Sequence, residues 1–193
     1  MDNTIVASKT ARKAFNSNLP SFEEYLKIFE QAGGTDTNYL KGHYYRFITA
    51  YGYLEPRLGE KKRILDIGAH WLHQALLYSL NGHNVIAADF PATLALAAVK
   101  KLAVDHNITL IEYSSLEDEA AFDILQENSI DCVLFSEILE HITFNPINFW
   151  KGVYRILSPG AKIVITTPNY YSASGKLKKI SRFIKGFGEH YCN

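Results

Sequence analysis

A glycine turn followed, one helix and one strand later, by an acidic residue is the most informative pattern in this chain of 193 residues. A short apolar run at 63–67 stops at Gly68, a helical pattern begins at Trp71, and a second apolar run at 85–88 ends in Asp89. This order predicts a strand, a tight turn, a helix and a strand with a carboxylate at its carboxyl end. Such a carboxylate binds the ribose hydroxyls of an adenosine-containing ligand, and the lack of a G-x-G-x-x-G sequence argues against NAD.

The elements that must position these residues follow from the apolar periodicity of the chain. Pro91 and Pro146 stand where the first residue of a helix favours proline, and Asn145 is a suitable cap. Regular alternation of strands and helices predicts right-handed crossovers and a parallel sheet. The expected fold is α/β, a doubly wound, mostly parallel, Rossmann-like sheet. Its strands are expected near 63–67, 84–88, 108–113, 130–136 and 161–167, and its helices near 71–81, 91–105, 117–126 and 145–157.

The N-terminal segment is predicted to be a helical cap. A capping box at 21–24 begins its first helix, which a glycine pair ends. A second helix, rich in tyrosine, is expected over 38–55 and is ended by Pro56. The predicted division is therefore a helical cap at 1–60 and a ligand-binding core at 61–193.

Composition limits the classes of function. Lys and Arg together number 20, as do Asp and Glu, so no net charge attracts nucleic acid or an anionic membrane. The N-terminus does not resemble a signal peptide, and no apolar run is long enough to span a membrane. Cys132 and Cys192 form neither a disulfide framework nor a metal site. The sequence predicts a cytoplasmic protein without a metal, nucleic-acid or membrane partner.

Four segments carry a resemblance to a known family. Ile64-Leu-Asp-Ile-Gly68 is followed by Asp89, then by Asp131-Cys-Val-Leu-Phe-Ser-Glu-Ile-Leu-Glu-His141, and then by a Pro-Gly turn at 159–160 with an apolar run after it. In this order, the segments resemble class I S-adenosylmethionine-dependent methyltransferases over about 61–169. The resemblance implies methyl transfer from S-adenosylmethionine to a hydroxyl or amine of a small molecule, such as a metabolite, a sugar or a natural-product intermediate.

The resemblance also implies a set of cofactor-binding residues. Asp89 would bind the ribose hydroxyls and Phe90 would lie along the adenine; helix capping by Asp89 and ordinary packing of Phe90 remain alternatives. Ser115 is placed equally well to contact adenine or to cap a helix. His70, where the family has glycine, can adopt a left-handed conformation or direct a donor at the cofactor's carboxylate. The full set is Asp66, Gly68, Ala69, His70, Asp89, Phe90, Ser114, Ser115, Leu116, Ser136 and Glu137.

His141 and His190 are the predicted catalytic residues. His141 directly follows the fourth strand, and its ordinary pKa near neutrality suits a general base; a structural role for Glu140 and His141 in the turn is the alternative. His190 resembles a loop histidine that contacts substrate in related enzymes. If the tyrosine-rich helix closes as a lid, Tyr44 or Arg46 would reach the cofactor's carboxylate; otherwise that helix covers the sheet.

Two departures from the family keep alternatives open. Ala69 and His70 replace glycines, and the chain has no counterpart of the last two strands of the fold, which predicts a shortened sequence or a partner chain at that edge. One alternative function is a non-catalytic adenosine-ligand or partner-binding module with a degenerate methyltransferase fold; another is a nucleotide-dependent oxidoreductase. Basic residues within 172–185 predict a solvated helix face or a site for an acidic group on the substrate.

Overall fold

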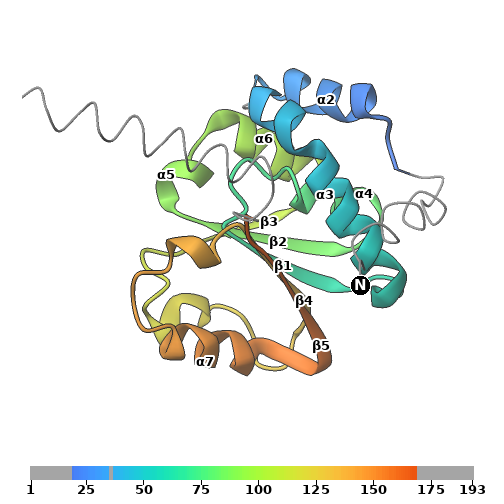
Figure 1. Cartoon of the computed structure of the whole chain (residues 1–193). Coiled ribbons are helices and arrows are strands. Elements are labelled where there is room, and N and C mark those ends of the chain that lie inside the picture. Colours follow the sequence, from blue (N-terminus) through green and yellow to red (C-terminus); the bar gives the residue numbers. More distant parts are fainter. Residues whose placement is uncertain (1–18, 35–36, 169–193) are drawn as a thin grey trace, which may run out of the picture.

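A parallel sheet of five strands organises residues 19–34 and 37–168, the part of the chain that the computed structural model describes (Figure 1). The strand order is β3-β2-β1-β4-β5, and every neighbouring pair is parallel. The predicted α/β class is therefore confirmed. Because the strand order reverses between β1 and β4, a topological switch point lies there, and ligands bind beyond the carboxyl ends of such strands. The strands are β1 Arg63–Ile67, β2 Asn84–Asp89, β3 Thr109–Glu112, β4 Ile130–Ser136 and β5 Leu157–Thr166.

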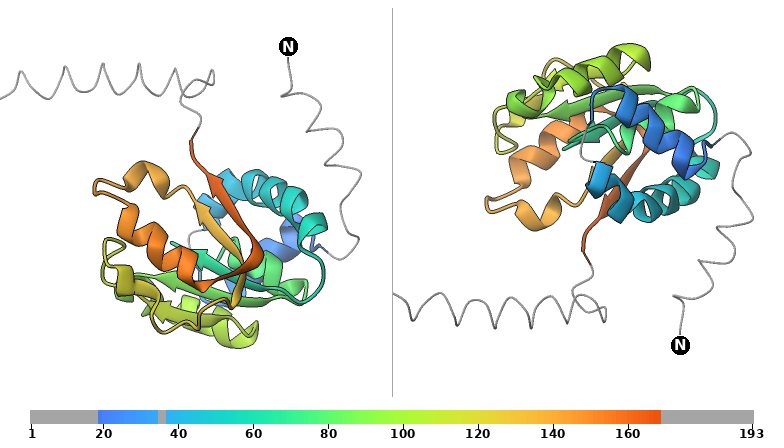
Figure 2. Two further views of the ribbon diagram at one scale, coloured as in Figure 1. Left: turned by 90° about the horizontal axis from the view of Figure 1, so that it is seen from below. Right: turned by 90° about the horizontal axis from the view of Figure 1, so that it is seen from above.

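Helices cover both faces of the sheet (Figure 2). Ile64 and Cys132 face one hydrophobic cluster, together with α3, α4 and α6, whereas Leu65 and Val133 face a second cluster with α7. This separation follows from the alternation of side chains along a strand. The helices are α2 Phe22–Gln31, α3 Thr37–Leu58, α4 Ala75–Leu80, α5 Pro91–Leu94, α6 Ala97–Asp105 and α7 Ile147–Ile156, with 3₁₀ turns η1 Glu119–Phe122 and η2 Leu139–His141.

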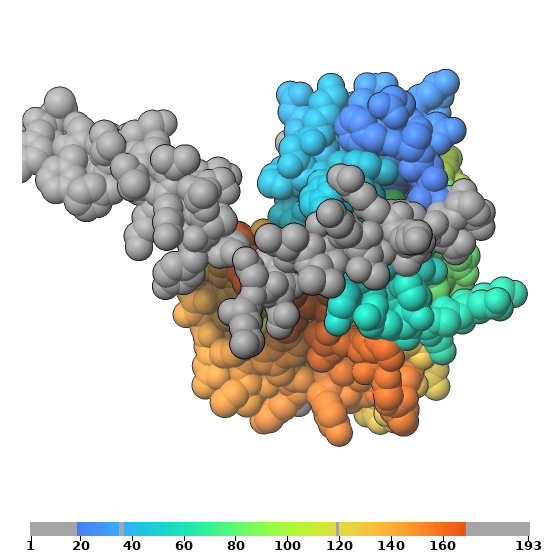
Figure 3. Space-filling view, turned by 45° about the vertical axis from the view of Figure 1, so that its right-hand side comes forward, coloured from blue at the N-terminus to red at the C-terminus, as the bar shows by residue number. Residues whose placement is uncertain are grey.

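The helical cap packs directly on one face of the sheet. The predicted capping box begins α2: Ser21 Oγ accepts a hydrogen bond from the Glu24 N–H at 3.2 Å, and the Glu24 carboxylate accepts from the Ser21 N–H at 2.7 Å. Tyr25 and Phe29 are fully buried, and the Tyr25 hydroxyl donates to the carbonyl of His73 at 2.6 Å. In the space-filling view the cap helices form one end of the molecule and α7 lies at the opposite end (Figure 3).

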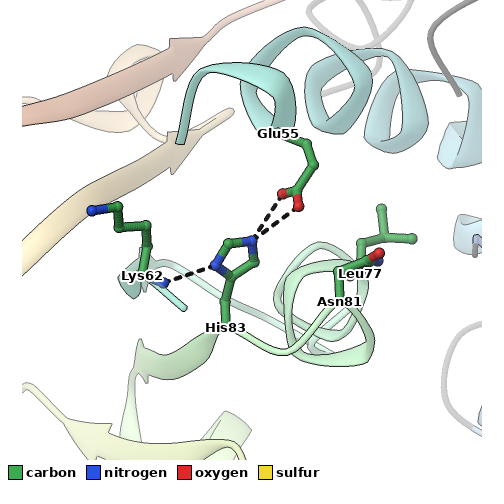
Figure 4. A network of polar contacts seen from close by, with 5 residues as sticks. All are labelled: Glu55, Lys62, Leu77, Asn81 and His83. Atoms are coloured by element: carbon green, nitrogen blue, oxygen red, sulfur yellow. Dashed lines mark hydrogen bonds and ion pairs between the residues drawn. The ribbon is translucent and has the colours of Figure 1, made fainter. Parts of the chain in front are cut away.

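A buried histidine fastens the C-terminal end of α3 to the start of β1 and β2 (Figure 4). His83 is 6% exposed, and its Nδ1 accepts a hydrogen bond from the Lys62 N–H at 3.0 Å. Because Nδ1 is an acceptor, the ring proton of neutral His83 lies on Nε2, which donates to the Glu55 carboxylate oxygens at 3.1 and 3.0 Å. The network places the C-terminal end of α3 at the amino-terminal edge of the sheet.

Several helix predictions differ from the structure. The helix expected over 71–81 begins only at Ala75, because turns occupy the preceding residues. The helix expected over 91–105 is broken at Leu96, whose extended backbone separates α5 from α6. Pro56 lies inside the last turn of α3, which continues to Leu58.

The remaining differences concern the second half of the sheet. The segment expected to be helical over 117–126 contains only the short turn η1. Strand β5 begins before the Pro-Gly pair: Ile130 pairs with Leu157 and Cys132 with Lys162, so segment 158–161 bulges out. Pro146, expected as the first residue of a helix after an Asn145 cap, is instead the residue that precedes α7, and no side chain caps this helix at that position. Asn145, one residue earlier, accepts a hydrogen bond from the Ile147 N–H at 3.2 Å.

Some predictions lie outside the described residues. These are His190, Cys192, the basic segment 172–185 and any strand after β5. Within the described sheet, β5 is an edge strand, and its Ile163 and Ile165 are 42% and 44% exposed. None of the described helices is both long and apolar enough to span a membrane.

Candidate functional site

Asp89 lies at the carboxyl edge of the sheet, where β2 ends. The residue is 6% exposed, and its carboxylate accepts hydrogen bonds from the His70 N–H and the Phe90 N–H, both at 2.7 Å. The two oxygens thus bind the loop after β1 and the residue before α5, a helix that has no side-chain cap at its N-cap residue Phe90. Each oxygen keeps a lone pair, so the fixed carboxylate can accept from two neighbouring hydroxyl groups.

The turn after β1 requires glycine at its first position. Gly68 has a φ of +71°, and a Cβ there would overlap Ile138 Cδ1 and lie 2.9 Å from its Cγ1. The N–H groups of Gly68 and Ala69 both donate to the Ala88 carbonyl, at 2.8 and 3.2 Å. These two N–H groups therefore bind the turn to β2. Contacts of Gly68 and Ala69 with a cofactor remain a prediction, and they must involve atoms other than these N–H groups.

The helix that was expected to start at this turn begins further along the chain. Because α4 starts at Ala75 and has only six residues, its N-terminus does not lie at Gly68. Instead, the loop passes through further left-handed residues, His70 at a φ of +50° and Leu72 at +64°. The left-handed conformation predicted for His70 is therefore confirmed, and it directs the His70 N–H to Asp89.

Asp66 is a buried carboxyl group beneath the turn. It is 3% exposed, and its Oδ2 has no hydrogen-bond partner in the described structure. Burial and the negative charge of Asp89 raise the pKa of Asp66 to about 8, although a hydrogen bond from the Ala75 backbone opposes this shift. A cationic group placed nearby would stabilise the ionised form of Asp66.

The segments after β2 and β3 contribute both polar and aromatic groups. Ser115 Oγ accepts from the Glu117 N–H at 3.1 Å, but Ser115 does not cap a helix, because η1 begins only at Glu119 and its N-cap is Asp118. Phe90 is 48% exposed, and its ring lies edge-on against buried Tyr113, with centroids 4.9 Å apart. An exposed ring on a rigid support can stack on a planar ligand. Contacts of Phe90, Ser114, Ser115 and Leu116 with adenine remain predictions.

The end of β4 brings a second carboxylate to the same edge. Ser136 Oγ is buried without a hydrogen-bond partner in the described structure, and Glu137 follows with a φ of +58°. The Glu137 carboxylate accepts from the Thr166 hydroxyl at 3.0 Å and lies 3.0 Å from Arg46 Nη1. Arg46, which was predicted to reach the cofactor's carboxylate, thus forms an ion pair with Glu137, and its Nη2 donates to the Tyr39 hydroxyl at 3.0 Å.

Aromatic rings connect the cap to the loop after β1. Tyr39 lies with its ring centroid 5.6 Å from His70 and stacks on His73 at 5.7 Å. The Trp71 indole N–H donates to His70 Nε2 at 2.8 Å. His70 is therefore part of a packed contact between loop and cap, in which Nε2 acts as an acceptor.

His141 ends the short turn η2 that follows β4. It is exposed, and its N–H donates to the Ile138 carbonyl at 2.8 Å. Its neighbour Glu140 accepts from the Thr167 hydroxyl at 3.4 Å. The imidazole is thus accessible on the segment leaving β4, and its catalytic role remains a prediction. Among residues 19–34 and 37–168, no group of three or more His, Cys, Asp and Glu is arranged to hold a metal ion.

Comparison with known proteins identifies the family to which this chain belongs. A family model described as a methyltransferase domain matches residues 39–192, most of the chain. The chain belongs to this methyltransferase family. It is an S-adenosylmethionine-dependent methyltransferase of class I, as the four sequence segments predicted. No curated protein matches its sequence.

Solved structures share the fold of this methyltransferase at low sequence identity. A protein of Methanococcus maripaludis, proposed to be an S-adenosyl-L-methionine-dependent methyltransferase, has a TM-score of 0.54 at 16% identity over 91% of this chain and 78% of its own. A Thermotoga maritima methyltransferase, described as a possible histamine N-methyltransferase, has a TM-score of 0.54 at 17% identity over 80% and 67%. Phosphoethanolamine N-methyltransferase 2 of Haemonchus contortus, in complex with S-adenosyl-L-methionine, has a TM-score of 0.50 at 21% identity over 85% and 40%.

The polar groups at the carboxyl edge of the sheet fit S-adenosylmethionine. Asp89 presents two fixed acceptors for a ribose diol, and the buried Asp66 Oδ2 still lacks a donor. An ammonium group near Asp66 would supply a hydrogen-bond donor to Oδ2 and would stabilise the ionised carboxylate. These features match the diol and the cationic part of the cofactor.

Sequence reasoning did not single out some residues that shape this edge. Tyr113 supports Phe90, and Ile138 packs on Gly68. Thr166 holds the Glu137 side chain, while Tyr39 holds the Arg46 guanidinium. Of these residues, the sequence pointed only to Tyr39, through the tyrosine content of its helix. The other contacts join segments that are distant in sequence.

Proposed function

We propose that this methyltransferase transfers a methyl group from S-adenosylmethionine to a hydroxyl or amine of a small molecule. The cofactor would lie across the carboxyl ends of β1, β2 and β4, with its ribose on Asp89. The observation that carries the proposal is the arrangement of Asp89, whose two oxygens are fixed by the His70 and Phe90 N–H groups at 2.7 Å. A carboxylate held in this way is preorganised for a vicinal diol.

The charges around the edge support a small acceptor. Asp89 places a carboxylate at this edge, the guanidinium of Arg46 beside it is already paired with Glu137, and the whole chain has no net positive charge. Nucleic-acid binding depends on cationic contacts with phosphates, which this edge does not favour. A neutral hydroxyl or a basic amine is compatible with it. Of the proteins compared above, one is named as a phosphoethanolamine N-methyltransferase and another as a possible histamine N-methyltransferase, which agrees with an amine acceptor.

The residues of the chain would act mainly by aligning the cofactor with the acceptor and by accepting a proton from the acceptor. When bound, S-adenosylmethionine supplies an electrophilic methyl group on a positively charged sulfur. Asp89 and the Gly68 turn would fix the position of that group, which favours in-line attack by the acceptor's lone pair. His141, exposed directly after β4, would accept the proton that a hydroxyl or ammonium acceptor must lose. The packed ring of Tyr39 over His73 would limit water on the cap side.

The proposal is tested by an acceptor screen on the full chain. The purified protein is incubated with S-adenosylmethionine and with separate panels of small amines, including histamine and phosphoethanolamine, and of small hydroxyl compounds. Formation of S-adenosylhomocysteine is measured, with short RNA and DNA as comparison acceptors. We expect turnover with members of a small-molecule panel and a lower rate in His141→Ala. Turnover with nucleic acid alone would contradict the proposal.

A further inference from the structure

One ion pair joins the helical cap to the carboxyl edge of the sheet. Arg46 lies on α3, whereas Glu137 directly follows β4, and Nη1 of the first is 3.0 Å from Oε2 of the second. The two side chains are 26% and 18% exposed, so solvent screens this pair less than a fully exposed one. The contact lies at the edge of the sheet that also contains Asp66 and Asp89.

Each partner is held in place by its own surroundings. Arg46 Nη2 donates to the Tyr39 hydroxyl at 3.0 Å, and its guanidinium lies 5.0 Å from the centre of the Phe47 ring. The Glu137 carboxylate accepts from the Thr166 hydroxyl at 3.0 Å, and the Glu137 N–H donates to the Thr166 carbonyl at 2.8 Å. A guanidinium and a carboxylate fixed in this way lose little further freedom when they pair.

The backbone of Glu137 adds an independent observation. Its φ of +58° is left-handed, a conformation that a residue with a long side chain adopts only at a cost. Such residues persist where the surrounding structure holds them, and they occur often at functional sites. Here the turn directs the carboxylate between Thr166 on β5 and Arg46 on the cap.

We propose that Arg46 and Glu137 form a clasp that holds α3 over the carboxyl edge of the sheet and thereby positions the cap for cofactor binding. This proposal rests on the proposed function. In it, Arg46 and Glu137 are positioning residues: they act through α3 and do not bind the cofactor's carboxylate. Nη1 and Nη2 of Arg46 are already paired, and Nε is buried without a partner in the described structure. A ligand carboxylate would therefore have to share the guanidinium with Glu137 and Tyr39.

The clasp is tested by a double-mutant cycle on the full chain. S-adenosylhomocysteine is titrated calorimetrically into wild type, Arg46→Gln, Glu137→Gln and the double variant. We expect each single substitution to weaken binding by roughly three- to tenfold, and the double variant to be no weaker than the weaker single variant. Arg46→Lys, which keeps the charge, should retain part of the affinity beside Glu137 but not in Glu137→Gln. Lys101→Gln, which removes one partner of the exposed Lys101–Asp105 pair, is the matched control and should not change binding.

Other outcomes overturn the clasp. Weaker binding in Arg46→Gln with unchanged or tighter binding in Glu137→Gln would mean that Arg46 contacts the cofactor itself. Additive losses would mean that the two residues act separately. If folded wild type does not bind S-adenosylhomocysteine, the proposed function fails, and hydrogen exchange still tests the clasp: amides of Thr37–Leu58 should exchange faster in both single variants. Unchanged exchange in α3 would contradict the clasp.

Discussion

Asp66→Asn should remove an unusual contribution to the dependence of stability on pH. Burial and the charge of Asp89 raise the pKa of Asp66 from 3.8 to about 8 in the folded chain. The folded state therefore keeps a proton that the unfolded state loses near pH 4, so stability falls as pH rises between these values. Each pH unit within this window costs about 1.36 kcal/mol per proton. Between pH 5 and pH 7 the Asp66 contribution should therefore fall by about 2 to 3 kcal/mol.

Urea unfolding of wild type and Asp66→Asn at pH 5, 6 and 7 measures this contribution. Asparagine is neutral throughout, so the free energy of unfolding of the variant should rise relative to that of wild type by about 2 to 3 kcal/mol between pH 5 and pH 7. Glu127→Gln, at an exposed position, is the control and should follow wild type. Parallel pH profiles for wild type and Asp66→Asn would refute the argument that burial keeps this carboxyl protonated.

Two further predictions concern the turn after β1 and the attachment of the cap, and each has a comparison variant. Gly68→Ala should lower the free energy of unfolding by about 2 to 4 kcal/mol, because it adds overlap with Ile138 to the cost of a positive φ. Gly82→Ala, with a φ of +83° and no neighbour within 4 Å, should cost only about 1 to 2 kcal/mol in the same urea titration. His83→Leu should lower stability by about 1 to 3 kcal/mol, because it leaves the Lys62 N–H and the Glu55 carboxylate without their partner. Glu55→Gln, whose amide oxygen can still accept from His83, should cost less than about 1 kcal/mol by thermal or urea unfolding; an equal loss in both would contradict the network.

The central strands were predictable from the sequence because they are largely apolar and buried on both faces. The bounds of β1 and β4 agree with the sequence prediction, since the apolar runs at 63–67 and 130–136 correspond to these two strands. The family and the cofactor class were also predictable, because Gly68 and Asp89 stand at the ends of recognisable strands. The structure also shows why position 68 requires glycine, since a Cβ there would overlap Ile138.

The helices and the contacts of the cap were less predictable. Leu72 and Leu76 fit a helical period, yet Leu72 adopts a φ of +64° and the helix begins only at Ala75. Local periodicity does not reveal this, because the loop is held by Asp89 on a different strand. The ion pair of Arg46 likewise depends on how α3 crosses the sheet, which no local pattern specifies.

The central claim, that Asp89 belongs to a cofactor site at the carboxyl edge, is tested most directly by calorimetric titration with S-adenosylhomocysteine. We expect wild type to bind it with a dissociation constant of the order of micromolar, about −8 kcal/mol, and not to bind NAD. Asp89→Ala should weaken binding by at least about tenfold, whereas Asp105→Ala, at the exposed end of α6, should leave the affinity unchanged. Equal affinity in wild type and Asp89→Ala, or no binding by a folded wild-type chain, would contradict the claim.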